Sequence, residues 1–212
     1  MSTFMKKLLS ISGDELSSNQ SVKDCSVLFN SPIAAQLDEL LREKNGFYGF
    51  ESALHVFPYE TTDKEIGLLD WNEKELWISA YEDMALDALY FAEDIFGGQF
   101  CLKDDGVYYF DPETANVDKL ANTINEWSKL ILSDYRVITG YPLAHSWQLI
   151  NGPIPTGCRL VPKIPFIAGG LYELSNLYMC TSHESLKIRA NIALQVRDIP
   201  DGSNIQIIIS DE

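Results

Sequence analysis

The sequence predicts an α+β fold in which a small antiparallel sheet, a meander, is wrapped by helices in a single domain with a C-terminal extension. The first observation is that residues 89–110 contain three short apolar segments. Gly97-Gly98 and Asp104-Asp105-Gly106 separate them, and Gly and Asp supply the backbone conformations of tight turns. The second is that stretches with helical spacing of apolar residues flank the meander. The third is length, because 212 residues can bury one good core.

The first part of the chain is divided at residue 30. Residues 1–30 form a polar, Ser-rich segment, and residues 31–140 are predicted to form the α+β core. A helix is expected to begin with Ser31 as the N-cap and Pro32 in its first turn, because proline has no N–H to leave unpaired there. Asn45-Gly46 then ends it. Its apolar residues recur at helical spacing: Ile33, Leu37, Leu40 and Leu41.

Three further segments complete the predicted core. Residues 47–58 are aromatic and short, and are interpreted as a helical turn that leads into a brief extended piece. Residues 68–84 are predicted to be helical with their aromatic side chains directed inward. After the meander, an amphipathic helix is expected to begin near Asn116. Its apolar stripe consists of Val117, Leu120, Ile124, Trp127 and Ile131.

Residues 141–212 are predicted to form the C-terminal extension, packed on the core. Five of the nine prolines lie between residues 140 and 170, so few helical turns are expected there. Residues 171–180 look extended, and Thr181-x-x-Glu184 is a capping box that predicts a following helix. Residues 204–209 are predicted to form a last apolar strand.

Composition favours a cytoplasmic protein. No apolar run reaches the roughly 18 residues that cross a bilayer, and the apolar stretch after Lys6-Lys7 is too short for a secretory signal. We therefore expect no membrane partner. The four cysteines lie far apart without a CxxC pair, so they are interpreted as reduced thiols that form neither a zinc site nor a disulfide framework.

The net charge of −15 argues against nucleic acid as a direct partner, because phosphates would be repelled. Between Glu65 and Asp118 there are fourteen acidic and two basic residues. Two interpretations stay open: a solvated acidic surface, or a negative face that steers a basic partner. For the second, the predicted partner-binding residues are Glu82, Asp83, Asp87, Glu93, Asp94, Asp104 and Asp105.

No catalytic, metal or cofactor motif is present. His55, His145 and His183 are not in an HxH, HExxH or HxxxH arrangement, and no phosphate-binding glycine loop occurs. The paired acids of the turns lack the DxDxDG spacing of a calcium loop. Cys101 is the first residue to test as a nucleophile, but its place in a predicted core strand favours an inert thiol. We therefore predict no catalytic residue, no metal and no cofactor.

Several motifs, taken in order along the chain, resemble the SUKH superfamily. They are Phe47-Tyr-Gly-Phe-Glu-Ser-Ala-Leu, Trp77 in its predicted helix, Tyr90-Phe-Ala-Glu-Asp-Ile-Phe-Gly-Gly-Gln-Phe, and Val107-Tyr-Tyr-Phe-Asp-Pro-Glu-Thr. The resemblance runs from about Phe47 to Leu132. The segments beginning at Arg159 and Asn176 are similar to an extension found in some bacterial members.

The resemblance implies an α+β fold and, for bacterial members, an immunity role: the protein binds and neutralises a toxin in the cytoplasm. Toxins countered by this family are often nucleases, whose clefts are basic, so the expected partner is a basic protein toxin domain. The resemblance supplies no catalytic or binding residues. It also leaves a second function open, a regulatory scaffold like the fungal cell-wall synthesis regulators of the family. A hydrolase is the third alternative.

Overall fold

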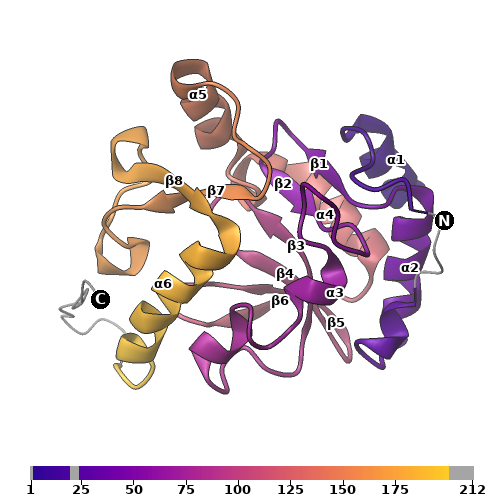
Figure 1. Ribbon diagram of the computed structural model, residues 1–212, viewed down its shortest axis with the longest axis horizontal. Helices are drawn as coiled ribbons and strands as arrows, with labels where there is room; N and C mark the ends of the chain where they lie inside the picture. The colour runs from indigo at the N-terminus through magenta and orange to yellow at the C-terminus, as the bar shows by residue number, and fades with distance from the viewer. Residues whose placement is uncertain (1, 20–23, 201–212) are drawn as a thin grey trace.

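The computed structural model of the protein describes residues 2–19 and 24–200, and it confirms the α+β class (Figure 1). One antiparallel sheet of six strands has the order β1-β2-β3-β4-β5-β6, and β7 and β8 form a separate two-stranded sheet. The strands are β1 (Phe47–Gly49), β2 (Leu54–Val56), β3 (Leu89–Asp94), β4 (Gln99–Lys103), β5 (Gly106–Phe110), β6 (Val117–Ala121), β7 (Cys158–Pro162) and β8 (Leu177–Thr181).

Helices cover both faces of the large sheet. In Figure 1, α4 lies behind it, α3 and α6 lie in front, and α1 and α2 lie beyond its right-hand end. The α-helices are α1 (Thr3–Ile11), α2 (Ala34–Glu43), α3 (Leu68–Trp71), α4 (Ile124–Ile138), α5 (Tyr141–Asn151) and α6 (Ser182–Val196). Four short 3₁₀ helices are η1 (Cys25–Val27), η2 (Ile78–Tyr81), η3 (Phe166–Ala168) and η4 (Leu174–Asn176).

The predicted meander is confirmed as β3, β4 and β5. Gly97 has a φ of +78° in the first turn, a conformation that glycine adopts without steric cost. At Gly98 a Cβ atom would lie only 1.9 Å from the hydroxyl oxygen of Tyr109, so the tyrosine ring packs directly on this backbone. Both glycines of the pair are therefore required, one for the turn and one for the packing.

Residues 47–58 form a β-hairpin, so the predicted helical turn is wrong. Phe47 pairs with Val56, and Val56 pairs in turn with Ala92 of β3, which places β1 and β2 at one edge of the large sheet. The hairpin turn contains residues 50–52, all with positive φ. Three consecutive non-glycine residues in this region give no sequence signal for a turn.

The amphipathic helix begins later than predicted, because residues 117–121 form β6 and pair with β5. Thr123 is the N-cap of α4, and its hydroxyl oxygen accepts a hydrogen bond of 3.0 Å from the Glu126 N–H. Val117 and Leu120 extend the helical apolar spacing backwards across the strand, which explains the error. Sheet pairing outweighs local spacing here.

Three other segments also differ from the sequence predictions. The proline-rich region contains α5, because Pro142 lies in the first turn, where proline is tolerated. Residues 68–84 form only α3 and the short η2, although Trp77 and Tyr81 are buried as expected. The α2 helix begins at Ala34 with Ile33 as its N-cap, so the predicted N-cap at Ser31 is wrong. The predicted strand at residues 204–209 lies outside the described residues.

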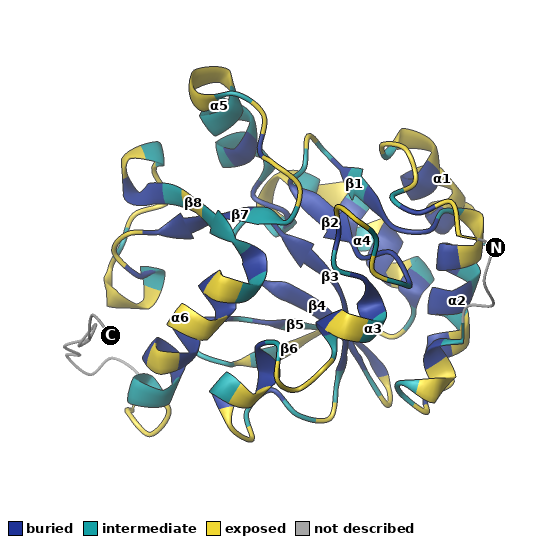
Figure 2. Cartoon of the chain, in the orientation of Figure 1, coloured by how far each residue is buried: buried dark blue, intermediate teal, exposed yellow. Residues whose placement is uncertain are grey.

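Two apolar clusters hold the molecule together, and Figure 2 shows the central strands β3 and β4 of the large sheet buried. The larger cluster includes Met5 and Leu8 of α1, so the polar N-terminal segment contributes to the same core. The smaller cluster joins the extension to the core through Ile95, next to β3, and Leu160 of β7. No helix among the described residues is long and apolar enough to cross a membrane.

The first prediction concerns Gly140, which has a φ of +67° between α4 and α5. A Cβ atom there would lie 2.4 Å from the Phe96 ring and 2.6 Å from the Ile95 side chain. We expect Gly140→Ala to lower the free energy of unfolding by about 2–4 kcal/mol, from backbone strain and overpacking together. Urea unfolding measures the change.

Gly169→Ala is the matched control. Gly169 has the same left-handed backbone as Gly140, with a φ of +88°, but nothing lies within 4 Å of the position of its Cβ atom. This variant carries the backbone strain alone, about 1 kcal/mol. Equal losses in the two variants would contradict the packing assigned to Gly140.

Candidate functional site

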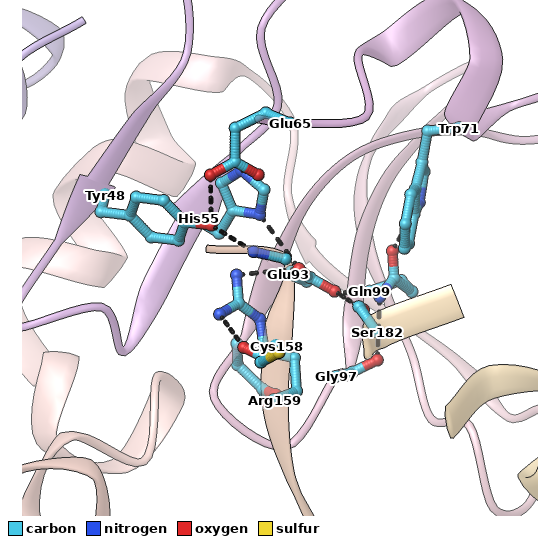
Figure 3. Close-up of polar contacts among 12 residues, drawn as sticks. Tyr48, His55, Glu65, Trp71, Glu93, Gly97, Gln99, Cys158, Arg159 and Ser182 are labelled. Carbon is cyan, nitrogen blue, oxygen red and sulfur yellow. Dashed lines mark hydrogen bonds and ion pairs between the residues drawn. The ribbon is translucent and has the colours of Figure 1, made fainter. Parts of the chain in front are cut away.

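A fully buried group of charged and polar side chains joins the C-terminal extension to the large sheet (Figure 3). We call His55, Glu65, Glu93 and Arg159 the buried charge cluster. The Glu93 Oε1 atom lies 2.8 Å from Nη2 of Arg159 and 3.0 Å from Nδ1 of His55. Glu93 also accepts hydrogen bonds from the Ser182 hydroxyl and, at 3.1 Å, from the Gln99 amide. Strands β2, β3 and β7 and helix α6 therefore meet at one carboxylate.

The protonation states of the cluster follow from these contacts. Burial alone would raise the pKa of Glu93, but the Arg159 guanidinium and the bonds from His55 and Ser182 lower it to about 2. Burial lowers the pKa of His55, so its ring is neutral at pH 7. Because Nδ1 faces the ionised Glu93, Nδ1 carries the proton and Nε2 is left with a lone pair. Nε2 lies 3.8 Å from Glu65 Oε2.

The cluster has a structural role. The side chains of Glu93 and Arg159 are each 0 % exposed, and that of His55 is 2 % exposed. A charge in such a place is tolerated only when it is paired and hydrogen-bonded. The cluster holds β7 and α6 on the sheet, and no part of it can contact a partner at the molecular surface.

Asp94 is also buried and organises the turn after β3. Its Oδ1 accepts hydrogen bonds from the backbone N–H groups of Phe96 and Gly98, at 2.8 and 2.9 Å. Its Oδ2 accepts one of 2.8 Å from the Tyr109 hydroxyl. Burial raises the pKa of Asp94 to about 7, although these three bonds act in the opposite direction.

These findings correct part of the predicted binding set. Glu93 and Asp94, at 0 % and 3 % exposed, are interior residues and do not belong to an acidic contact face. The sequence suggested exposure because acids are common in turns. The structure instead gives each carboxylate several donors, which offsets the cost of burial.

The other five predicted residues are exposed, and the structure separates them into two groups. Glu82 and Asp83 contact the end of α6, where Arg197 lies 2.7 Å from Asp83 and 3.5 Å from Glu82. The second group, which surrounds a surface hollow of about 520 Å³, consists of Asp87, Asp104 and Asp105. We call this region the acidic hollow.

The acidic hollow also contains aromatic and basic groups. Phe29 and Tyr108 line it together with Lys103. Asp105 is held by Lys119 and by the Tyr108 hydroxyl, each at 2.7 Å. Within the described part of the chain, the side chains of Asp87 and Asp104 make no ion pair, so both carboxylates are available to a partner.

An apolar groove, which no sequence pattern indicated, lies between the core and the extension. Its volume is about 580 Å³, and its walls include Phe96, Val137, Leu143 and Tyr172. Val137 and Tyr172 are 75 % and 62 % exposed. Because the lining residues come from segments far apart in the chain, no local pattern could have identified the groove.

One asparagine closes the exposed loop beside this groove, residues 164–171. The Asn176 amide donates to the carbonyl oxygens of Ile164 and Leu171, at 3.0 and 3.1 Å. Its Oδ1 accepts a 2.9 Å bond from the Ile164 N–H. Tyr172, directly after the loop, stacks on Phe166 with ring centroids 3.8 Å apart.

The residues first considered for catalysis lie in unrelated places. Cys101 is buried in β4, and burial raises the pKa of its thiol to about 12, so it does not supply a thiolate at neutral pH. His145 lies on α5, where its Nδ1 is 2.7 Å from the exposed Glu51 carboxylate. His183 lies in the first turn of α6. Among residues 2–19 and 24–200, no group of His, Cys, Asp and Glu could hold a metal ion.

Comparison with known proteins supports the fold but identifies neither a family nor a function. No family model matches the chain, and no curated protein matches it. A solved structure, that of Atu4351 from Agrobacterium tumefaciens, has a similar fold, with a TM-score of 0.55 and 12 % sequence identity. The similarity covers 86 % of each chain.

The second prediction tests the Arg159–Glu93 pair. Arg159→Met leaves the Glu93 carboxylate buried without its cation, so the free energy of unfolding should fall by about 3–5 kcal/mol. Adding Glu93→Gln should recover part of the loss, because the uncompensated charge is then removed. Arg197→Met removes an exposed ion pair and should change little. Equal effects of the two arginine variants in urea unfolding would refute the role assigned to the cluster.

The third prediction concerns pH. Because the pKa of folded His55 is lowered, its contribution to stability is present above the unfolded pKa of about 6.5 and is lost as the pH falls below that value. The difference in unfolding free energy between the wild type and His55→Gln should therefore shrink by up to about 1.4 kcal/mol per pH unit. Urea unfolding at pH 7, 6 and 5 measures it.

Titrations of other groups occur in both the wild type and His55→Gln, so they cancel in the difference between the two unfolding free energies. The raised pKa of Asp94 acts with the opposite sign over the same range, but it is common to both proteins. His183→Gln serves as the control, and its difference from the wild type should not vary in the same way. A constant difference for His55→Gln would contradict the neutral buried ring.

Proposed function

We propose that this protein is a non-enzymatic immunity protein of the SUKH type, which binds and neutralises a basic protein toxin in the cytoplasm. The observation that carries the proposal is the acidic hollow, where Asp87 and Asp104 present unpaired carboxylates next to Phe29 and Tyr108. The resemblance of residues 47–132 to the superfamily supplies the class of partner. The net charge of −15 agrees with it.

Charge raises the rate at which such a protein associates with its partner. An immunity protein must reach its toxin before the toxin acts, and opposite charge can raise the association rate by about 10- to 1,000-fold. If the toxin is a nuclease, its cleft is basic because it holds phosphates, and carboxylates can occupy the phosphate positions. Phe29 and Tyr108 would add apolar contact area, which slows dissociation.

The backbone near the hollow also supports a binding role. Asp87 has a φ of +59°, in the left-handed region that non-glycine residues seldom adopt. Such conformations are retained where the surroundings impose them, and they cluster at functional sites. The segment before β3 therefore holds an exposed carboxylate in a fixed place at some cost in stability.

A co-expression assay tests the proposed function. The C-terminal domain of a large secreted protein encoded immediately upstream would be expressed in bacteria with and without this chain. We expect growth to be restored by the chain and a stable complex to be recovered from the same cells. Continued killing, with both proteins present in soluble form, would reject the proposal, and so would a neighbouring gene that encodes no toxin.

The fourth prediction is that Asp87→Asn/Asp104→Asn slows association with that domain by roughly three- to tenfold at low ionic strength, and that the effect fades as salt rises. Stopped-flow binding at about 0.05 and 0.5 M NaCl measures it. Asp14→Asn/Asp63→Asn is the matched control, because it removes two exposed carboxylates from other segments. Equal slowing in both variants would reject a special role for the hollow.

A further inference from the structure

A second, smaller pocket lies where the extension meets the turn after β5, and we call it the junction pocket. Its volume is about 280 Å³. The core contributes Tyr109, Asp111 and Glu113, and the extension contributes Phe166, Tyr172 and Arg189. The two parts are tied together at the pocket wall, because the backbone N–H of Ile167 donates a 2.8 Å hydrogen bond to Glu113 Oε2.

Glu113 has one carboxylate oxygen without a partner. The residue is only 4 % exposed, yet its Oε1 makes no hydrogen bond to any part of the chain that the structure describes. An unsatisfied buried acceptor of this kind costs stability, by about 1–3 kcal/mol or more when charged. Burial correspondingly raises the pKa of Glu113. A buried oxygen with no partner in the described chain calls for one from outside it, either a water molecule or a group that enters the pocket.

The arginine in the pocket does not pair with this carboxylate. Arg189 donates through Nε to the Ser185 carbonyl oxygen at 3.1 Å and through Nη2 to the Ser185 hydroxyl at 2.9 Å. Its Nη1 donates to the carbonyl oxygen of Phe96. No ion pair within 4.0 Å joins Arg189 to Glu113 or Asp111 among the described residues. Two carboxylates and one guanidinium leave the junction pocket with a net negative charge.

The remaining walls are aromatic. Tyr172 is 62 % exposed and lies parallel to Phe166, at an interplanar angle of 8°. Phe96 packs edge-on against both rings, with centroid distances of 5.6 Å. Aromatic faces next to carboxylates attract cations, and they also cover the hydrocarbon part of a long side chain.

We propose that the junction pocket receives one lysine or arginine side chain of the partner protein, with its charged head at the carboxylates of Asp111 and Glu113 that line the pocket and its stem against Tyr172 and Phe166. The volume supports a single side chain, because pockets for drug-sized molecules begin at about 300 Å³. This inference rests on the proposed function, which supplies the basic partner. It adds a buried anchor to the exposed acidic hollow, and desolvated anchors carry most of the energy of an interface.

The fifth prediction follows from this arrangement. Glu113→Gln keeps an acceptor for Ile167 and removes the charge, so the variant should fold and unfold at the same temperature as the wild type or a higher one. Its affinity for the toxin domain, measured by isothermal titration calorimetry, should be at least about tenfold weaker, mainly through faster dissociation. Tyr172→Ala, at an exposed position, should also weaken binding by about tenfold.

Glu75→Gln is the matched control, because Glu75 is an exposed glutamate in another segment. It should bind within about twofold of the wild type. If the wild type binds the toxin domain tightly and Glu113→Gln binds as well as Glu75→Gln, the pocket assignment is overturned while the proposed function stands.

A second measurement tests the pocket without the toxin. N-acetyl-lysine methylamide is titrated into ¹⁵N-labelled protein, with N-acetyl-norleucine methylamide as its uncharged counterpart. We expect the amide signals of Glu113 and Ile167 to shift with the lysine compound only, and not in Glu113→Gln. If the wild type does not bind the toxin domain, this titration is the only measurement that tests the pocket assignment. Absence of a shift at tens of millimolar ligand would then overturn the pocket assignment as well.

Discussion

The contact between Arg159 and Glu93 is the interaction on which the rest of the structure depends. Glu93 belongs to the central meander and Arg159 to the extension, and both are inaccessible to solvent. Their charges can remain in the interior only as a pair, because removing either partner would leave the other charge buried without compensation. The acidic hollow is built without the extension, whereas residues of the extension form part of the walls of the groove and of the junction pocket.

The meander and the fold class could be predicted from the sequence because their signals are local. Glycine and aspartate mark the turns around Gly97 and Gly106, and each strand lies within a few residues of its partner. The hairpin of β1 and β2 could not be predicted in the same way. Its turn uses Phe50, Glu51 and Ser52 with positive φ angles, and these residue types do not indicate such a turn. Strand β6 could not be predicted because the spacing of its apolar residues suits a helix equally well.

The candidate site, like the fold, could be predicted only in part from the sequence. Sequence identified an acid-rich region but could not separate Asp87 and Asp104, which face solvent, from Glu93 and Asp94, which are enclosed. That distinction depends on donors supplied by residues up to 89 positions away, such as Ser182 at Glu93. Glu113 was missed for the same reason: it lies in an ordinary turn, and only the loop from the extension turns it into a pocket wall.

Three exposed positions in the loop closed by Asn176 can change without changing the fold. The ends of this loop are fixed by three bonds from one amide side chain, and its exposed apolar residues, Ile164, Ile167 and Leu171, contribute little to the two cores. Related proteins could therefore diversify these three positions as long as the Asn176 hydrogen bonds, Phe166 and Gly170 are kept. Sequence variation could then gather at these few positions, while the scaffold beneath them stays unaltered.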